Sequence, residues 1–284
     1  MKDSRSEPWS LVVTPKSQWF NLNLQEIWRY RDLLLLFLRR DVVTVYKQTI
    51  LGPLWFIIQP VLTTIIFTVI FGNVAKIPTD GLPPLLFYLS GIIVWNYFSD
   101  CVRTTSDAFK KNQNIFGKVY FPRVIVPLST VLSNLVKFGV QFFLFLGFLF
   151  YYSFQLELPS LGFSLLLFPL LVLIAAGLSL GFGMIISSLT TKYRDFTFLV
   201  SFGIQLAMYA TPVIYPLSEA PEKYKILILA NPMSSLIETF RTIFLGTGDL
   251  NFLNILYSLS FAMILLVFGL LVFNKTEKTF MDTV

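Results

Sequence analysis

Long apolar runs without charged residues alternate with short polar segments along most of the chain. A helix that crosses the hydrocarbon core of a bilayer needs about 20 mostly apolar residues. Ile226 to Ile237 forms one further apolar stretch, but it has only 12 residues and contains Pro232, so it is too short to cross. The pattern therefore predicts an all-α integral membrane protein with six transmembrane helices, in which this short stretch is re-entrant. The six long runs are 48–75, 81–99, 124–156, 158–191, 196–218 and 250–274.

The N-terminal segment has a different periodicity. Apolar residues recur at helical spacing while charged residues, among them Arg29, Arg39 and Arg40, occupy the other faces. This pattern predicts an amphipathic helix on the inner membrane surface, and a helix packed against other protein is the alternative. We divide the chain into a cytoplasmic segment 1–48, a membrane domain 49–274 and a cytoplasmic tail 275–284. The apolar positions are Leu24, Trp28, Leu35, Leu38, Val42 and Val45.

Composition supports the membrane assignment, and charge gives the orientation. The chain is 55% hydrophobic and 13% charged, with a mean hydropathy of +0.70, which excludes a soluble domain of 284 residues. With both termini inside, 17 of the 22 Lys and Arg residues are cytoplasmic and four are outside. This asymmetry predicts cytoplasmic termini. It also explains the net charge of +6 by topology and anionic lipids, without nucleic acid.

The residue types that are missing limit the chemistry. There is no His and a single cysteine, Cys101, so we expect no disulfide within the chain and no metal site. None of the six runs has Asp or Glu in its interior, which argues against proton-coupled transport. No GxxxxGK[ST] loop is present, so the chain has no ATP site of its own. Uphill transport would need power from another subunit.

Polar residues within the runs mark two helix faces. Trp55, Gln59 and Thr63 are spaced by four residues around Pro60, which removes a helical hydrogen bond from the Phe56 carbonyl. This face suits a polar path, although helix packing without any ligand is equally compatible with it. A second stripe joins Thr130, Asn134, Lys137 and Gln141. Lys137 either contacts substrate or bonds to neighbouring helices.

Several motifs in order resemble one family. They are "RRDVVTVYKQTILGPLWFIIQP", "FGKVYFPRVIVPL", "TPVIYP", "NPMSSLIETFR" and "KTEKTFMDTV", and they extend over nearly the whole chain. Together they resemble the permease subunits of ABC type-2 exporters of cell-surface polysaccharides, such as O-antigen, teichoic acid and capsule exporters. At Lys137 the chain departs from the residue expected in many relatives, so no family role is transferred to it.

The resemblance implies an assembly and a location. It predicts a homodimer in the bacterial plasma membrane that exports a lipid-linked polysaccharide along a partly aromatic path at the dimer interface. Two separate ATPase subunits would bind ATP and Mg, and they would contact residues 103–123 and 190–195 on the cytoplasmic side. Residues 212–248 would form re-entrant helices at the outer leaflet.

Candidate residues follow from these arguments. We expect Phe116 to be exposed and to insert into the ATPase. Asp195 should either contact the ATPase or cap the fifth predicted span. Glu238 and Arg241 should pair with each other, and the alternative is that both contact a sugar or pyrophosphate. The path candidates are Trp55, Phe56, Gln59, Thr63, Gln205 and Tyr209; the coupling candidates are Asp107, Lys110, Lys111, Phe116, Lys118, Arg123, Arg194 and Asp195; the outer-leaflet candidates are Pro212, Tyr215, Pro232, Glu238 and Arg241.

Two other functions stay open at this point. A permease of the same architecture that exports a drug or a lipid has the same topology. A membrane enzyme would need catalytic groups gathered on one face, but the outer acidic residues are scattered along the chain: Asp80, Glu157, Glu219, Glu222, Glu238 and Asp249.

Overall fold

The computed structural model describes residues 24–47, 50–116, 118–119, 121–155, 162–193, 195–248 and 250–283. Within these ranges every regular element is a helix, as predicted. Five helical segments are long and apolar enough to cross a membrane: Gly52–Val74, Pro84–Ser106, Ile125–Ser153, Ser164–Lys192 and Phe252–Glu277. They contain α3 (Trp55–Phe67), α4 (Pro84–Ser106), α7 (Ile125–Ser153), α8 (Leu167–Lys192) and most of α12 (Phe252–Thr283).

The fifth predicted span is shorter than its apolar run. Helix α9 (Phe196–Tyr209) has 14 residues, about 21 Å at 1.5 Å per residue, which is less than the about 30 Å of a hydrocarbon core. The helix ends there because Pro212 disfavours a helical conformation at Thr211. Residues 210–215 form turns instead. A sixth crossing helix is therefore not confirmed.

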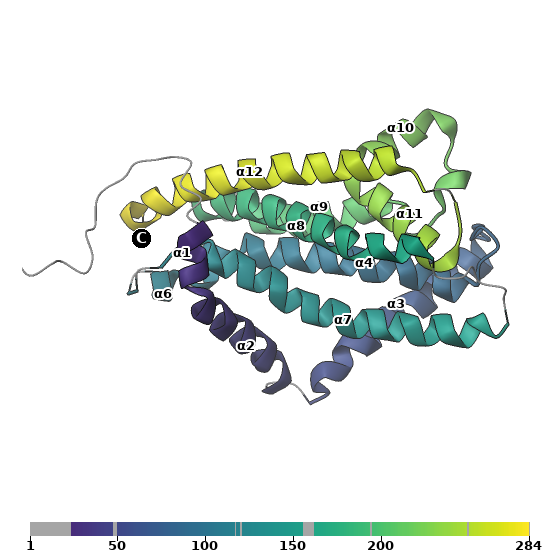
Figure 1. Cartoon of the computed structure of the whole chain (residues 1–284), viewed down its shortest axis with the longest axis horizontal. Helices are drawn as coiled ribbons and strands as arrows, with labels where there is room; N and C mark the ends of the chain where they lie inside the picture. Colours follow the sequence, from purple (N-terminus) through teal and green to yellow (C-terminus); the bar gives the residue numbers. More distant parts are fainter. Residues whose placement is uncertain are drawn as a thin grey trace, which may run out of the picture.

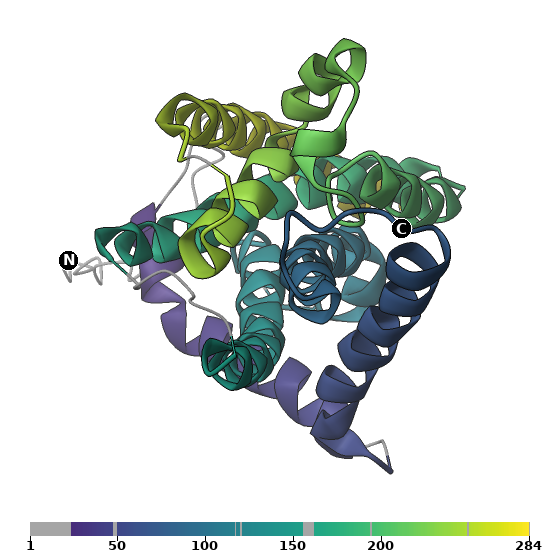
Figure 2. The same ribbon diagram turned by 90° about the vertical axis from the view of Figure 1, so that its right-hand side faces the viewer.

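Helix α4 forms the centre of the bundle. Figure 2 shows it surrounded by the other helices, and 83% of its apolar window is buried inside the chain. For the first span the corresponding value is 11%, so few residues of α3 are fully buried within the chain and the others are half-buried or exposed. Pro53 lies in the first turn of this span, where the N–H that proline lacks would have no helical partner.

The predicted N-terminal helix is present as two pieces, α1 (Leu24–Arg29) and α2 (Arg31–Lys47). Phe37 is buried and its ring packs against Phe121 at 5.7 Å, whereas Trp28 and Leu35 are 69% and 57% exposed. One side of this two-part helix thus contacts the bundle, while another side leaves apolar residues exposed. Both predicted environments, protein and lipid, are compatible with this arrangement, and placement on a membrane surface remains a prediction.

The two ends of the bundle differ in chemistry. In Figure 1, α1, α6 and the C-terminal part of α12 lie at one end. We call it the basic end because α5, which contacts α6, ends with Lys110 and Lys111, and because Arg123 pairs with Glu277 of α12. Figure 1 places α10 and α11 at the opposite end. Helix α12 continues beyond the predicted span end at Asn274. The remaining helices are η1 (Gly52–Leu54), η2 (Thr68–Val74), α5 (Ala108–Lys111), α6 (Gln113–Phe116), η3 (Phe163–Leu166), η4 (Leu217–Glu219), α10 (Glu222–Ala230) and α11 (Pro232–Leu245).

Candidate functional site

A polar cavity of about 500 Å³ lies at the basic end, between α2, the start of α3, α4 and α7. This volume falls in the about 300–1,000 Å³ range that is typical of small-molecule sites. Eleven of the fifteen residues that line it have charged, amide or hydroxyl side chains, and Phe56 adds an aromatic ring. The lining residues are Arg40, Asp41, Val42, Thr44, Phe56, Asp100, Thr104, Ala108, Lys111, Asn112, Thr130, Ser133, Asn134, Val136 and Lys137.

An ion pair joins two helices across this cavity. Lys137 Nζ on α7 lies 2.5 Å from Asp100 Oδ2 on α4, and the two side chains are 20% and 27% exposed. The ammonium also lies 5.6 Å from the centre of the Phe56 ring on α3. Lys137 therefore bonds a neighbouring helix, one of its two predicted roles, but its partner is a carboxylate. The sequence analysis missed this partner because it ended the second apolar run at Ser99, whereas α4 continues to Ser106.

The predicted polar stripe on α7 divides into two environments. Thr130, Asn134 and Lys137 line the cavity, and Asn134 Nδ2 donates a hydrogen bond to Thr104 Oγ1 at 3.0 Å. Gln141, one turn further along, is 1% exposed and lies outside the cavity lining. The stripe is thus accessible only over its first two turns.

The coupling candidates differ widely in accessibility. Lys110 and Lys118 are exposed, and Lys111 pairs with Asp107 at 3.3 Å. Asp195 occupies the N-cap position of α9, but its side chain makes no capping hydrogen bond. The carboxylate of Asp195 is exposed. Arg194 lies outside the described residues.

The prediction of an exposed Phe116 is wrong. Its side chain is 4% exposed, and its ring lies 5.8 Å from the rings of both Phe109 and Phe121. The Arg123 guanidinium lies 5.3 Å from the Phe116 ring centre and donates a hydrogen bond to the Glu277 carbonyl on α12. The polar neighbours in sequence suggested exposure, but the segment folds its aromatic side chains inward because burying them together removes apolar surface from water.

The path candidates lie on two helices. Trp55 and Tyr209 are 47% and 49% exposed, and Gln59 and Gln205 are exposed as well. Thr63 is half-buried and donates to the Gln59 carbonyl within its own helix. Phe56 differs from the others because it lines the polar cavity. Helix α3 packs on α4 and α7, and α9 packs on α4 and α8.

At the opposite end, Arg241 on α11 connects three segments. The side chain is 1% exposed and donates to the Pro212 and Val213 carbonyls at 2.7 and 2.9 Å. The guanidinium carbon lies 3.7 Å from the centre of the Phe87 ring on α4. The predicted pair with Glu238 is confirmed at 3.1 Å. Burial raises the pKa of the Glu238 carboxyl, and the charge of Arg241 opposes this shift.

Local sequence explains how α11 begins and ends. Asn231 caps the helix by accepting from the Met233 N–H at 3.1 Å, and Pro232 follows in the first turn. Gly246 ends it in the left-handed conformation at φ 71°. The short apolar stretch 226–237 is therefore divided between α10 and a buried α11, which begins at Pro232. Tyr215 is half-buried and Pro212 is buried beside it.

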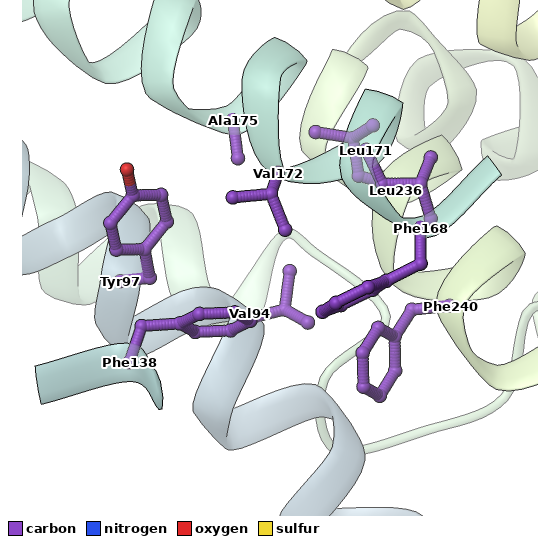
Figure 3. A pocket seen from close by; sticks show the side chains of 9 residues that line it. All are labelled: Val94, Tyr97, Phe138, Phe168, Leu171, Val172, Ala175, Leu236 and Phe240. Atoms are coloured by element: carbon purple, nitrogen blue, oxygen red, sulfur yellow. The ribbon is translucent and has the colours of Figure 1, made fainter. Parts of the chain in front are cut away.

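A second cavity, in the interior of the bundle, is apolar. It measures about 20 Å³, room for about one water molecule, so no sugar fits. Figure 3 shows Tyr97 as the one labelled side chain with a polar atom. In the described ranges, no three acidic or cysteine side chains gather to hold a metal ion. The lining residues are Val94, Tyr97, Phe138, Phe168, Leu171, Val172, Ala175, Leu236 and Phe240.

A bundle of long apolar helices with a polar cavity at a basic end is typical of a multi-pass membrane transport subunit. The chain matches the ABC-2 type transporter family over residues 32–245 and belongs to it. It is 32% identical to the O-antigen export system permease protein RfbA of Klebsiella pneumoniae over 252 residues, 88% of this chain and 94% of that protein. The protein of the same name from Myxococcus xanthus is 31% identical over 78% of this chain and 83% of its own length. The polysialic acid transport protein KpsM of Escherichia coli is 23% identical over 86% of this chain and 93% of its own length.

Proposed function

We propose that this chain is the membrane permease subunit of an ABC exporter that moves a lipid-linked cell-surface polysaccharide out across the bacterial plasma membrane. The observation that carries the proposal is its 32% identity to an O-antigen export permease over 94% of that protein's length. The match covers 88% of this chain. The polar cavity at the basic end supports a hydrophilic cargo over a drug or a membrane lipid.

The proposed topology has six crossings and two cytoplasmic termini. Helix α9 and the turns that follow it, 210–216, make the fifth crossing, and α10 and α11 lie re-entrant in the outer leaflet. Helix α2 lies along the inner surface with Trp28 and Leu35 toward lipid. The concentration of Lys and Arg at the basic end supports this orientation through the positive-inside rule.

The working unit in this proposal is a homodimer with the glycan path between the copies. Helix α3 supports such an interface because only 11% of its apolar window is buried within one chain. Trp55, Gln59 and Thr63 on α3, with Gln205 and Tyr209 on α9, would line the path. Aromatic faces and amides offer a sliding glycan many weak contacts, none of which holds it tightly.

Two ATPase subunits, which bind ATP and Mg, would dock at the basic end. Asp107, Lys110, Lys111 and Lys118 offer an accessible polar surface around α5 and α6. Phe116 and Arg123 would contribute indirectly, because they anchor this segment to α12 and the core. Movement of the ATPases would then be transmitted to α4, from which the segment continues.

Reconstitution with the ATPase subunit of the same exporter tests the proposal. We expect ATP hydrolysis in proteoliposomes to rise when lipid-linked glycan extracted from the source cell is supplied. The control uses the same lipid carrier after the glycan has been removed. Hydrolysis that ignores the glycan but rises with small amphiphiles would identify a drug or lipid exporter instead.

A further inference from the structure

The polar cavity has a charge pattern that selects among ligands. Each cation on its wall already has a carboxylate partner within the chain. Arg40 lies 2.8 Å from Asp41, Lys137 lies 2.5 Å from Asp100, and Lys111 lies 3.3 Å from Asp107. A phosphate would have to compete with these carboxylates, so the cavity offers little net attraction to an anion.

The same wall is rich in groups that suit hydroxyls. Carboxylates accept hydrogen bonds from sugar hydroxyls, and ammonium and amide groups donate to them. The threonine and serine hydroxyls already donate to backbone carbonyls of their own helices, so they offer a ligand acceptor oxygens, which a sugar hydroxyl can use and an ionised phosphate cannot. These groups come from α2, α4, α7 and the residue between α5 and α6, and they surround one space: Asp41, Asp100, Lys137, Asn112, Asn134, Thr44, Thr104, Thr130 and Ser133.

An aromatic ring completes the composition of the wall. Phe56 lines the cavity from α3 with Lys137 Nζ 5.6 Å from its ring centre. A ring face beside paired charges and amides matches a sugar, which presents C–H groups on its faces and hydroxyls around its edge. Phe56 directly follows Trp55, the first residue of the face proposed to line the path on α3, so an occupant would lie close to that path.

We propose that this cavity is a sugar-binding site on the cytoplasmic side, in which sugar units of the lipid-linked substrate bind between α2 and α7 before translocation. The assignment rests on the proposed export of a glycan. The sugar-binding site lies within a single protomer, whereas the proposed glycan path lies between the two protomers. Neutral, hydroxyl-rich headgroups bind there in preference to phosphate headgroups.

A protection experiment tests this preference. The full chain with Cys101→Ser and Ser133→Cys is placed in phosphatidylcholine vesicles, and the rate at which a polar maleimide labels residue 133 is measured. Monoglucosyl diacylglycerol or phosphatidic acid with the same acyl chains is then added in equal amounts. We expect the glucosyl lipid to slow labelling about fivefold, as binding at about four times its Kd would do. Phosphatidic acid leaves the rate nearly unchanged.

Controls locate the effect in the cavity. Ser153→Cys lies exposed at the far end of α7, and its labelling should not respond to the sugar. Adding Asp100→Asn and Lys137→Gln should abolish protection at residue 133, while Lys223→Gln on α10 should preserve it. Equal or stronger protection by phosphatidic acid would overturn the proposal in favour of an anionic lipid site. If neither lipid protects residue 133, the proposal is also overturned. The proposed export function would still be tested separately, by ATP hydrolysis in the presence of the lipid-linked glycan.

Discussion

At the residue scale, Arg241 is the side chain whose removal we expect to destabilise the chain most. Arg241→Met keeps much of the side-chain volume but leaves the Pro212 and Val213 carbonyls and the Glu238 carboxylate without their donor. Removing one partner of a buried ion pair costs about 3–5 kcal/mol. The variant should therefore unfold at a clearly lower temperature in detergent, as followed by tryptophan fluorescence.

The partner carboxylate provides the internal control for Arg241. Because burial raises the Glu238 pKa and Arg241 opposes the shift, the carboxylate without Arg241 is costly when ionised. Glu238→Gln combined with Arg241→Met should recover part of the lost stability, and the exposed Lys223→Met should lose none. If Arg241→Met unfolds at the wild-type temperature, these hydrogen bonds do not stabilise the end of the bundle opposite the basic end.

The Lys137 and Asp100 pair gives a second prediction at this scale. Both side chains are partly exposed, so solvent screens the pair and its coupling is moderate. In a double-mutant cycle with Lys137→Met and Asp100→Asn, we expect each single change to destabilise the chain and the double change to cost less than their sum. A coupling of about 0.5–2 kcal/mol, measured from thermal unfolding, fits contacting residues. Additive effects would show that the pair is energetically independent.

At the element scale, the close approach of α8 and α12 depends on glycine. A Cβ at Gly269 would lie 2.6 Å from the Gly181 carbonyl oxygen, and one at Gly181 would lie 2.9 Å from the Leu265 backbone. Small residues generally allow helices in membranes to approach each other closely. The contact involves backbone, which cannot rotate away as a side chain can.

Gly269→Ala should therefore push α12 away from α8 and destabilise the bundle by about 1–3 kcal/mol, as overpacking does. The measurement is the midpoint of unfolding in a denaturant series. Gly139→Ala on α7 is a matched control because a Cβ there meets nothing within 4 Å. It should be neutral or slightly stabilising. A result with equal effects at both positions would contradict the packing argument.

At the scale of the whole molecule, the orientation in the membrane is the property to test. In the Cys101→Ser background, Lys118→Cys lies at the basic end and Lys223→Cys lies on α10 at the other. In cells whose outer envelope is permeabilised but whose plasma membrane is intact, we expect a membrane-impermeant maleimide to label residue 223. Residue 118 should be labelled only after the plasma membrane is also permeabilised. The reverse pattern would place the termini outside and refute the proposed orientation.

The sequence by itself determined the all-helical membrane class, the long apolar runs and their order. These properties depend on local hydrophobicity and length, which a one-dimensional pattern contains. It also gave the Glu238 and Arg241 pair, because residues three apart on a helix face each other. Its motifs indicated the transporter family to which the chain belongs.

Only the tertiary structure decided which distant residues meet. Lys137 pairs with Asp100 across 37 positions, and Arg241 reaches the Val213 carbonyl across 28. Phe116, predicted to be exposed from its polar neighbours, is buried because side chains from other segments cover it. Such contacts depend on how the helices pack and where they end. The apolar runs were predicted to end at Ser99 and Ser218 from hydrophobicity alone, and hydrophobicity alone does not give the helix ends or their packing.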